Sequence, residues 1–168
     1  MTISMYQASV PVFQRMLKSL AVILGKGEAH AAARKIDPEV LINGRLYPDM
    51  LPFVRQIQIA SDTAKGCAAR LAGLDPPKYE DNEQTFPELA ARIAKTLKYL
   101  ETFKAAQIDG SEQRAIELKM RDHTVNLVGQ QYLLNMALPN FYFHVTTAYD
   151  ILRHCGVELG KKDFIGTP

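Results

Sequence analysis

The chain lacks the features typical of disulfide-stabilised, membrane-spanning or nucleic-acid-binding proteins. Its only cysteines, Cys67 and Cys155, lie in different predicted helices, and we interpret them as small, reduced hydrophobic residues. The 20 basic and 18 acidic residues leave a net charge of +2, with no basic cluster for nucleic acid or an anionic membrane. No apolar run reaches the roughly 20 residues that cross a bilayer, and no signal-peptide pattern opens the chain. We therefore expect a cytoplasmic protein with no nucleic-acid and no membrane partner.

What the sequence does contain is a series of amphipathic helices. Its length of 168 residues and its apolar content of 47% predict a single domain over residues 1–168. Apolar residues at steps of three and four predict a first long helix from about residue 4 to residue 24. Pro11 should bend this helix or loosen its first turn, and Gly25 and Gly27 should end it.

A long connection to about residue 48 follows the first helix. Two short helices are predicted in it, at 28–35 and 38–43. Asp37 is the expected N-cap of the second, and Pro38 follows in its first helical position. The second long helix is predicted over 49–72, where small inward residues allow a neighbouring helix to approach closely. One such long crossover lets neighbouring helices of a bundle run parallel.

A capping box predicts where the third long helix begins. Thr85 and Glu88 stand three residues apart before an apolar stripe that continues to about residue 104. After this helix the spacing of the apolar residues changes from 3.6 residues to 2 residues. They alternate with polar residues over 116–120 and over 124–128. Such alternation predicts a small β-hairpin between the third and fourth helices.

The last long helix is the most informative part of the sequence. After a short helical lead over 130–137, an amphipathic helix is predicted from Leu138 to Gly156, with a proline in its first turn. Asn140 and His144 stand four residues apart and so lie one turn apart on the same face. His144 falls beside the apolar stripe and should point into the bundle.

The helix order, the long first crossover and the inward histidine resemble the DinB/YfiT-like four-helix-bundle superfamily. The sequence LPNFYFHVTTAY from Leu138, Asp62 in the second helix and the closing LGKKDFIG from Leu159 are similar to an uncharacterised, domain-of-unknown-function branch of it. The resemblance covers essentially the whole chain. It implies an all-α, DinB-like four-helix bundle with a long first crossover and a small β-hairpin between helices three and four.

The resemblance also implies where a metal would bind. Well-known members hold a divalent metal with one histidine of the second helix and a His-x-x-x-His pair of the fourth, and several are thiol-dependent transferases or detoxifying enzymes. In this chain the second histidine of the pair matches His144 and the first matches Asn140, while the histidine of helix two falls at or near Gln58. Amide oxygens are weak ligands for transition metals, so we expect no cofactor, with a divalent metal at His144 as the alternative.

The candidate pocket residues each have a structural interpretation as well. His144 is either a pocket residue or a core imidazole oriented by Asn140 or Gln58, since a buried amide must find partners in either case. Asp62 either faces the pocket or pairs with Lys65. Arg55 either pairs with an acid or marks an anion site at the pocket mouth.

Two functions from different classes remain open. The first is a small-ligand-binding or stress-related module with a degraded metal site, and the second is a metal-dependent hydrolase or thiol transferase that uses His144. We also expect a homodimer, because polar and aromatic residues recur on the outer face of the last helix: Tyr142, Thr146, Tyr149 and Arg153. The apolar residues of the tail would bury either in that interface or against their own bundle: Leu159, Phe164 and Ile165.

Overall fold

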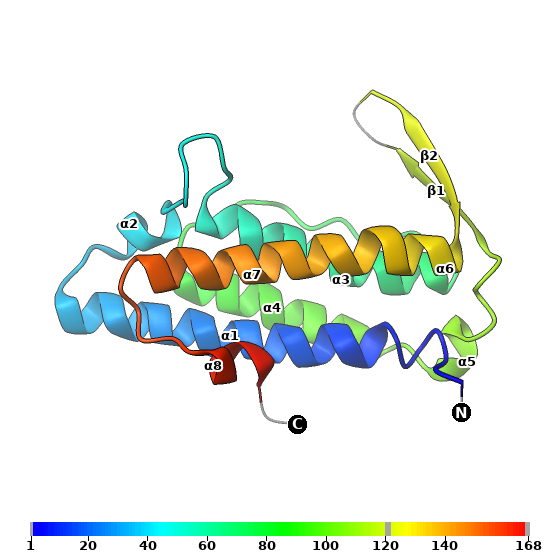
Figure 1. Ribbon diagram of the computed structural model, residues 1–168, viewed down its shortest axis with the longest axis horizontal. Coiled ribbons are helices and arrows are strands. Elements are labelled where there is room, and N and C mark those ends of the chain that lie inside the picture. The colour runs from blue at the N-terminus through cyan, green and yellow to red at the C-terminus, as the bar shows by residue number, and fades with distance from the viewer. Residues whose placement is uncertain (1, 120–121, 167–168) are drawn as a thin grey trace.

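The computed structural model describes residues 2–119 and 122–166 and shows a helical bundle with a small hairpin at one end (Figure 1). The long helices are α1 (Val10–Arg34), α3 (Phe53–Leu71), α4 (Phe86–Leu100) and α7 (Leu138–His154). The short elements are α2 (Pro38–Ile42), α5 (Ala105–Ile108), α6 (Gly129–Tyr132), a π-helical turn η1 (Leu133–Ala137) and α8 (Lys161–Ile165). Apolar faces of the long helices meet in a continuous core. The predicted all-α bundle is confirmed.

Both predicted ends of the first helix are wrong. Helix α1 begins at Val10, so Pro11 lies in its first turn, where its missing N–H costs nothing and no bend is needed. The helix also continues through Gly27 to Arg34. A Cβ on Gly27 would lie 2.8 Å from Leu152 Cδ1 of α7, so the glycine serves close helix packing rather than helix termination. Tertiary contact here outweighs the weak helix propensity of glycine.

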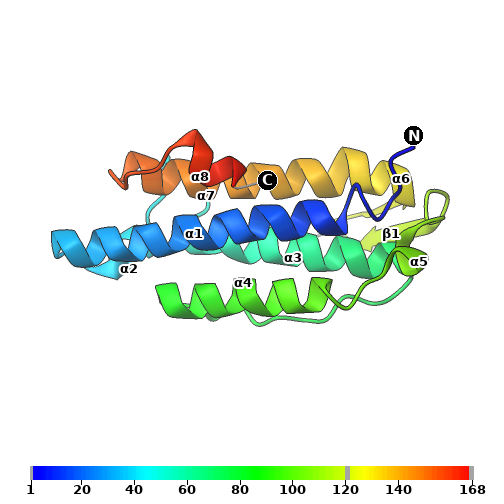
Figure 2. The same cartoon turned by 90° about the horizontal axis from the view of Figure 1, so that it is seen from below.

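The bundle contains a parallel pair of neighbouring helices, α3 and α4. Their first residues, Phe53 and Phe86, lie at the same end with ring centroids 6.2 Å apart. The connection over 72–85 therefore runs back along the bundle before α4 begins (Figure 1). In the view of Figure 2, α1 lies between α7 and α4, and it contacts both. The first connection, which contains α2, is shorter than predicted because α1 extends further.

The predicted capping box opens α4. Thr85 Oγ1 accepts a hydrogen bond from Glu88 N at 3.3 Å, and the Glu88 carboxylate accepts from the backbone of Gln84 and Thr85. The helix ends at Leu100, four residues earlier than predicted, and α5 follows as a separate turn.

The predicted hairpin is present as the antiparallel strands β1 (Ala115–Lys119) and β2 (Thr124–Val128). One face of the ladder is apolar, because Ile116 lies opposite Leu127 and Leu118 opposite Val125. Met120, predicted as the end of the first strand, lies outside the described residues. The hairpin and the loop before α3 project from the same side of the bundle (Figure 1).

Residues 129–154 form a nearly continuous helical segment, in which η1 joins α6 to α7. Its inner face is the predicted one, with Phe141, Val145, Ala148 and Leu152 fully buried. The tail folds back on its own bundle: α8 packs on α1, and the ring of Phe164 lies 6.0 Å from that of Tyr149. Among the described residues, we find no helix with the length and apolar character to cross a membrane.

Candidate functional site

The predicted pocket residues lie on two different sides of α3. His144 is 7% exposed, and its ring Nδ1 lies 2.6 Å from Oε1 of Gln56, which is itself buried. Gln58 stands two positions further along the same helix, about 200° around it, and its side chain binds Arg55 and Glu83 instead. The expectation that Gln58 or Asn140 orients the imidazole is therefore wrong. Gln56 has that role, because it is the glutamine that α3 turns toward α7.

The hydrogen bonds of Gln56 fix which imidazole nitrogen carries the proton. Its amide Nε2 donates to the Leu51 carbonyl at 2.8 Å, so its oxygen faces His144 and accepts from Nδ1–H. In a neutral imidazole this leaves the lone pair on Nε2. Burial lowers the pKa of His144 below its ordinary value, which favours this neutral form.

The donors around His144 do not fit the metal that the fold family implies. Nδ1 is occupied by Gln56, and Asn140 is exposed and donates from Nδ2 to Thr63 Oγ1 at 2.8 Å. Within residues 2–119 and 122–166, no three His, Cys, Asp or Glu side chains converge closely enough to hold a metal ion. One imidazole nitrogen is too few for zinc, whose protein sites use three or four nitrogen, sulfur or carboxylate ligands.

A stability measurement tests this account of His144. In the unfolded chain the imidazole of His144 takes up a proton near pH 6.5, whereas in the folded protein its pKa is lower. The neutral imidazole therefore contributes fully to the free energy of unfolding above about pH 6.5. This contribution is lost as the pH falls through the lower pKa of the folded state. We expect His144→Gln to lose less unfolding free energy between pH 7.5 and 5 than the wild type in urea titrations. His154→Gln, which removes an exposed histidine of the same helix, should behave like the wild type. Equal losses in all three proteins would contradict the buried neutral imidazole.

The opposite side of α3 carries a network of charged side chains around Arg92 of α4. The Arg92 side chain is 1% exposed, and it forms ion pairs with Asp62 at 2.8 Å, Asp81 at 3.0 Å and Glu83 at 2.9 Å. Asp62 also binds Lys65 at 2.6 Å, which confirms the predicted pair. The network joins α3, α4 and the crossover between them.

Arg55 and Gln58 belong to the same network. Arg55 donates to Gln58 Oε1 at 2.6 Å and pairs with Asp81 at 2.5 Å, so it has the acidic partner that the sequence left open. Gln58 Nε2 in turn donates to Glu83 at 2.8 Å. Partial burial opposes ionisation of Asp81, but the hydrogen bond and charge of Arg55 and the charge of Arg92 lower its pKa overall. These groups hold the crossover against the bundle.

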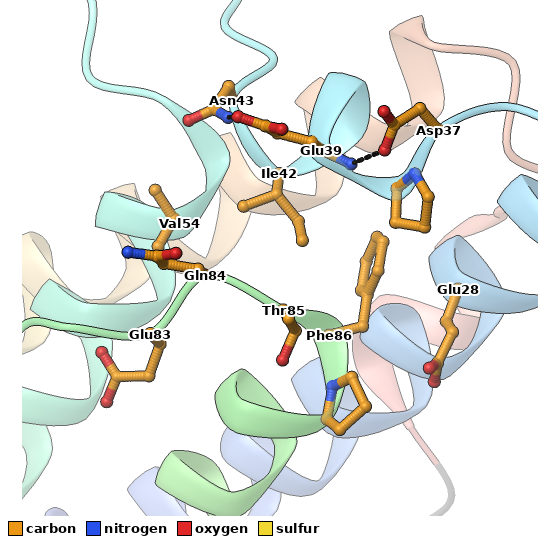
Figure 3. Close-up of a pocket in the computed structure, with 12 residues that line it drawn as sticks. Glu28, Asp37, Glu39, Ile42, Asn43, Val54, Glu83, Gln84, Thr85 and Phe86 are labelled. Carbon is orange, nitrogen blue, oxygen red and sulfur yellow. Dashed lines mark hydrogen bonds between the residues drawn. The ribbon is translucent and has the colours of Figure 1, made fainter.

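A cleft of about 760 Å³ opens beside this network, at the α2 end of the bundle (Figure 3). Its walls come from α1, α2, the first turn of α3 and residues 83–87. The apolar lining residues are Pro38, Ile42, Val54, Phe86 and Pro87, and the polar ones are Glu28, Asp37, Glu39, Asn43, Glu83, Gln84 and Thr85. In the view of Figure 3, Ile42 and Phe86 lie in the middle, with Glu28, Asp37 and Glu39 around them.

Sequence reasoning missed this cleft almost entirely. The sequence indicates roles at helix ends for Asp37, Asn43, Thr85 and the two prolines of the lining, and places Val54 on the inner face of the second predicted helix. The sequence did contain a sign that Arg92 is buried. It lies one position before Ile93, on the inward-facing side of α4. The carboxylates of the cleft have no such pattern, because they come from segments far apart in the chain.

The bundle and the inward His144 place this protein among the DinB-like helical-bundle proteins. A crystal structure of a DinB family member protein from Shewanella denitrificans matches with a TM-score of 0.88 and 44% sequence identity. The match covers 97% of this chain and 92% of that one.

The particular family is shown by a match to a sequence model. The model of the family described as a domain of unknown function (DUF1993) matches residues 5–165, and the chain belongs to this family. No curated protein matches the chain.

Proposed function

We propose that this protein is a homodimeric small-ligand-binding module that uses the cleft at the α2 end and has no transition metal at His144. The observation that carries the proposal is the cleft itself. Its volume of about 760 Å³ falls within the range of about 300–1,000 Å³ that is usual for small-molecule sites. Its lining combines apolar residues with polar groups, and small-molecule sites use both.

The cleft has a fixed wall on the side of the Arg92 network. Glu83 lines the cleft, and its carboxylate is held by Arg92 and by Gln58. The capping box holds the neighbouring residues 84 and 85. A preorganised wall supports ligand binding, because little side-chain freedom is then lost when a ligand enters.

Ligand-detected NMR with a library of small fragments tests the proposal. We expect saturation transfer to a subset of fragments, and loss of that transfer in Val54→Trp, whose indole would fill the cleft. Val22→Trp is the matched control, since Val22 is an exposed apolar residue of α1 outside the cleft. The proposal fails if no fragment binds, or if Val54→Trp binds the same fragments as the control.

The proposal includes a prediction about metal content. Protein purified without a histidine tag should carry far less than one equivalent of zinc, nickel or iron, because amides stand where the superfamily has two of its histidines. Elemental analysis checks this. A stoichiometric metal that disappears in His144→Ala would instead favour the metal-dependent hydrolase or thiol transferase.

The proposed dimer uses exposed apolar residues around the start of α7. Leu134, Tyr142 and Phe143 are 49%, 38% and 56% exposed, and aromatic residues are enriched in interfaces. Tyr149 is a weaker candidate than the sequence indicated, because the chain's own Phe164 covers part of it. We expect a dimer mass by light scattering at micromolar concentration, and a monomer after Tyr142→Glu with Phe143→Glu. Val22→Glu should remain dimeric, and a monomeric wild type would refute the dimer.

A further inference from the structure

We infer that the ligand of the cleft is an organic cation, namely an amine attached to an apolar body. This inference rests on the proposed function, since it names the class of ligand that the same cleft would take. It follows from the donors, the acceptors and the apolar residues of the lining.

Several of the backbone donors at the two helix starts beside the cleft are already used or missing. Glu39 N donates to Asp37 Oδ1 at 3.0 Å, and Pro38 and Pro87 have no N–H. The N–H groups of Gln84, Thr85 and Glu88 are taken by the capping box at the start of α4. A helix N-terminus ordinarily attracts anions through such N–H groups, and here those of Glu39 and Glu88 are not available to a ligand.

The acceptors, by contrast, are in excess. Among the residues that the structure describes, four carboxylates line the cleft and no lysine or arginine does. Glu83 is neutralised by Arg92, whereas Glu28, Asp37 and Glu39 have no ion-pair partner in the described part of the chain. A positively charged donor would satisfy these groups, and an anion would be repelled.

The apolar lining argues for an organic ligand rather than a metal ion. Pro38 and Pro87 of the lining are exposed and Val54 is half-buried. Apolar surface is therefore open to a ligand above the buried Ile42 and Phe86. Within the described residues, no three of these carboxylates come together in a group that could hold a metal ion. A ligand that bridges the carboxylates and covers the apolar residues must therefore be larger and partly apolar.

Calorimetric titration with three matched probes tests this inference. The probes are 2-phenylethylamine, 2-phenylethanol and 3-phenylpropionate, which are a cation, a neutral molecule and an anion with the same aromatic ring. We expect the amine to bind most tightly and to weaken as salt is added. Its affinity should fall at least about tenfold in Glu28→Gln with Glu39→Gln, as expected when about 1.4 kcal/mol of charge interaction is lost. Asp37 stays unchanged because it caps α2.

The control carries the same loss of charge at the opposite end of the bundle. Glu101→Gln with Glu117→Gln removes two exposed carboxylates and should bind the amine like the wild type. If the alcohol or the carboxylate binds as tightly as the amine, and Val54→Trp abolishes that binding, the ligand is not a cation and the proposed function stands. If none of the three probes binds, the inference is wrong, and the fragment library decides the proposed function separately.

Discussion

Replacement of Phe141 by alanine is expected to lower the free energy of unfolding by about 3–5 kcal/mol, the range for truncating a fully buried phenylalanine. Phe141 of α7 is completely buried, and the edge of its ring contacts Phe13 of α1 with centroids 4.9 Å apart. Alanine would leave a cavity between two of the long helices, and neighbouring side chains could fill only part of it. Urea denaturation followed by circular dichroism measures the loss.

Phe143 provides a control two positions away on the same helix. Its side chain is 56% exposed in the single chain, so Phe143→Ala should change the unfolding free energy of the monomer by no more than about 0.5 kcal/mol, measured at a concentration below that of the proposed dimer. Because both variants remove the same ring from α7, helix propensity cannot explain a difference between them. Similar losses in the two variants would show that the inner face of α7 is wrongly assigned.

Replacement of Arg92 by methionine is expected to cost about 3 kcal/mol, the lower end of the range for removing one member of a buried ion pair. The side chain is 1% exposed, and its removal leaves Asp62, Asp81 and Glu83 without their shared cation. The loss falls at the lower end because Asp62 and Asp81 are 40% and 34% exposed and can recover hydration. Methionine keeps much of the packing volume, so the loss reports mainly on the charge.

Two observations distinguish this network from an ordinary surface ion pair. Lys98→Met, an exposed position on the same helix, should leave stability nearly unchanged. Hydrogen exchange should accelerate over residues 72–85 in Arg92→Met, because the crossover loses its main anchor to α3 and α4. An Arg92→Met protein as stable as the wild type, with an unchanged exchange pattern, would contradict the role of the network.

The long helices could be predicted from the sequence because each carries a local, periodic pattern. The stripe of α7, the capping box of α4 and the alternation in β1 and β2 need only residues within a few turns of one another. The helix ends were less predictable where a distant contact decided them. Gly27 ended the predicted first helix, yet its close contact with Leu152, 125 positions later, keeps the observed helix continuous.

The candidate site was harder to predict than the fold. A resemblance placed a ligand position at or near Gln58, but only the rotation of α3 in the bundle decides that Gln56 meets His144 and Gln58 meets Glu83. Arg92 and Asp62 are 30 positions apart, and no local pattern links them. The cleft draws on four segments between Glu28 and Pro87, so it exists only once the bundle has assembled.

The two sides of α3 therefore have different roles in this account. On one side His144 and Gln56 form a buried neutral pair, and the described residues bring no group of three His, Cys, Asp or Glu side chains together there, as a transition metal would need. On the other side the Arg92 network fixes the crossover whose Glu83 lines the cleft. The proposed function rests on the cleft beside this network.

The most direct test of this account is to map the bound ligand on the two-dimensional amide spectrum of the labelled protein. On titration with the tightest fragment from the library, we predict the largest shifts at the backbone amides of Ile42, Val54 and Phe86. Shifts confined to Gln56, Asn140 and His144 would contradict the account and place the functional site on the opposite side of α3.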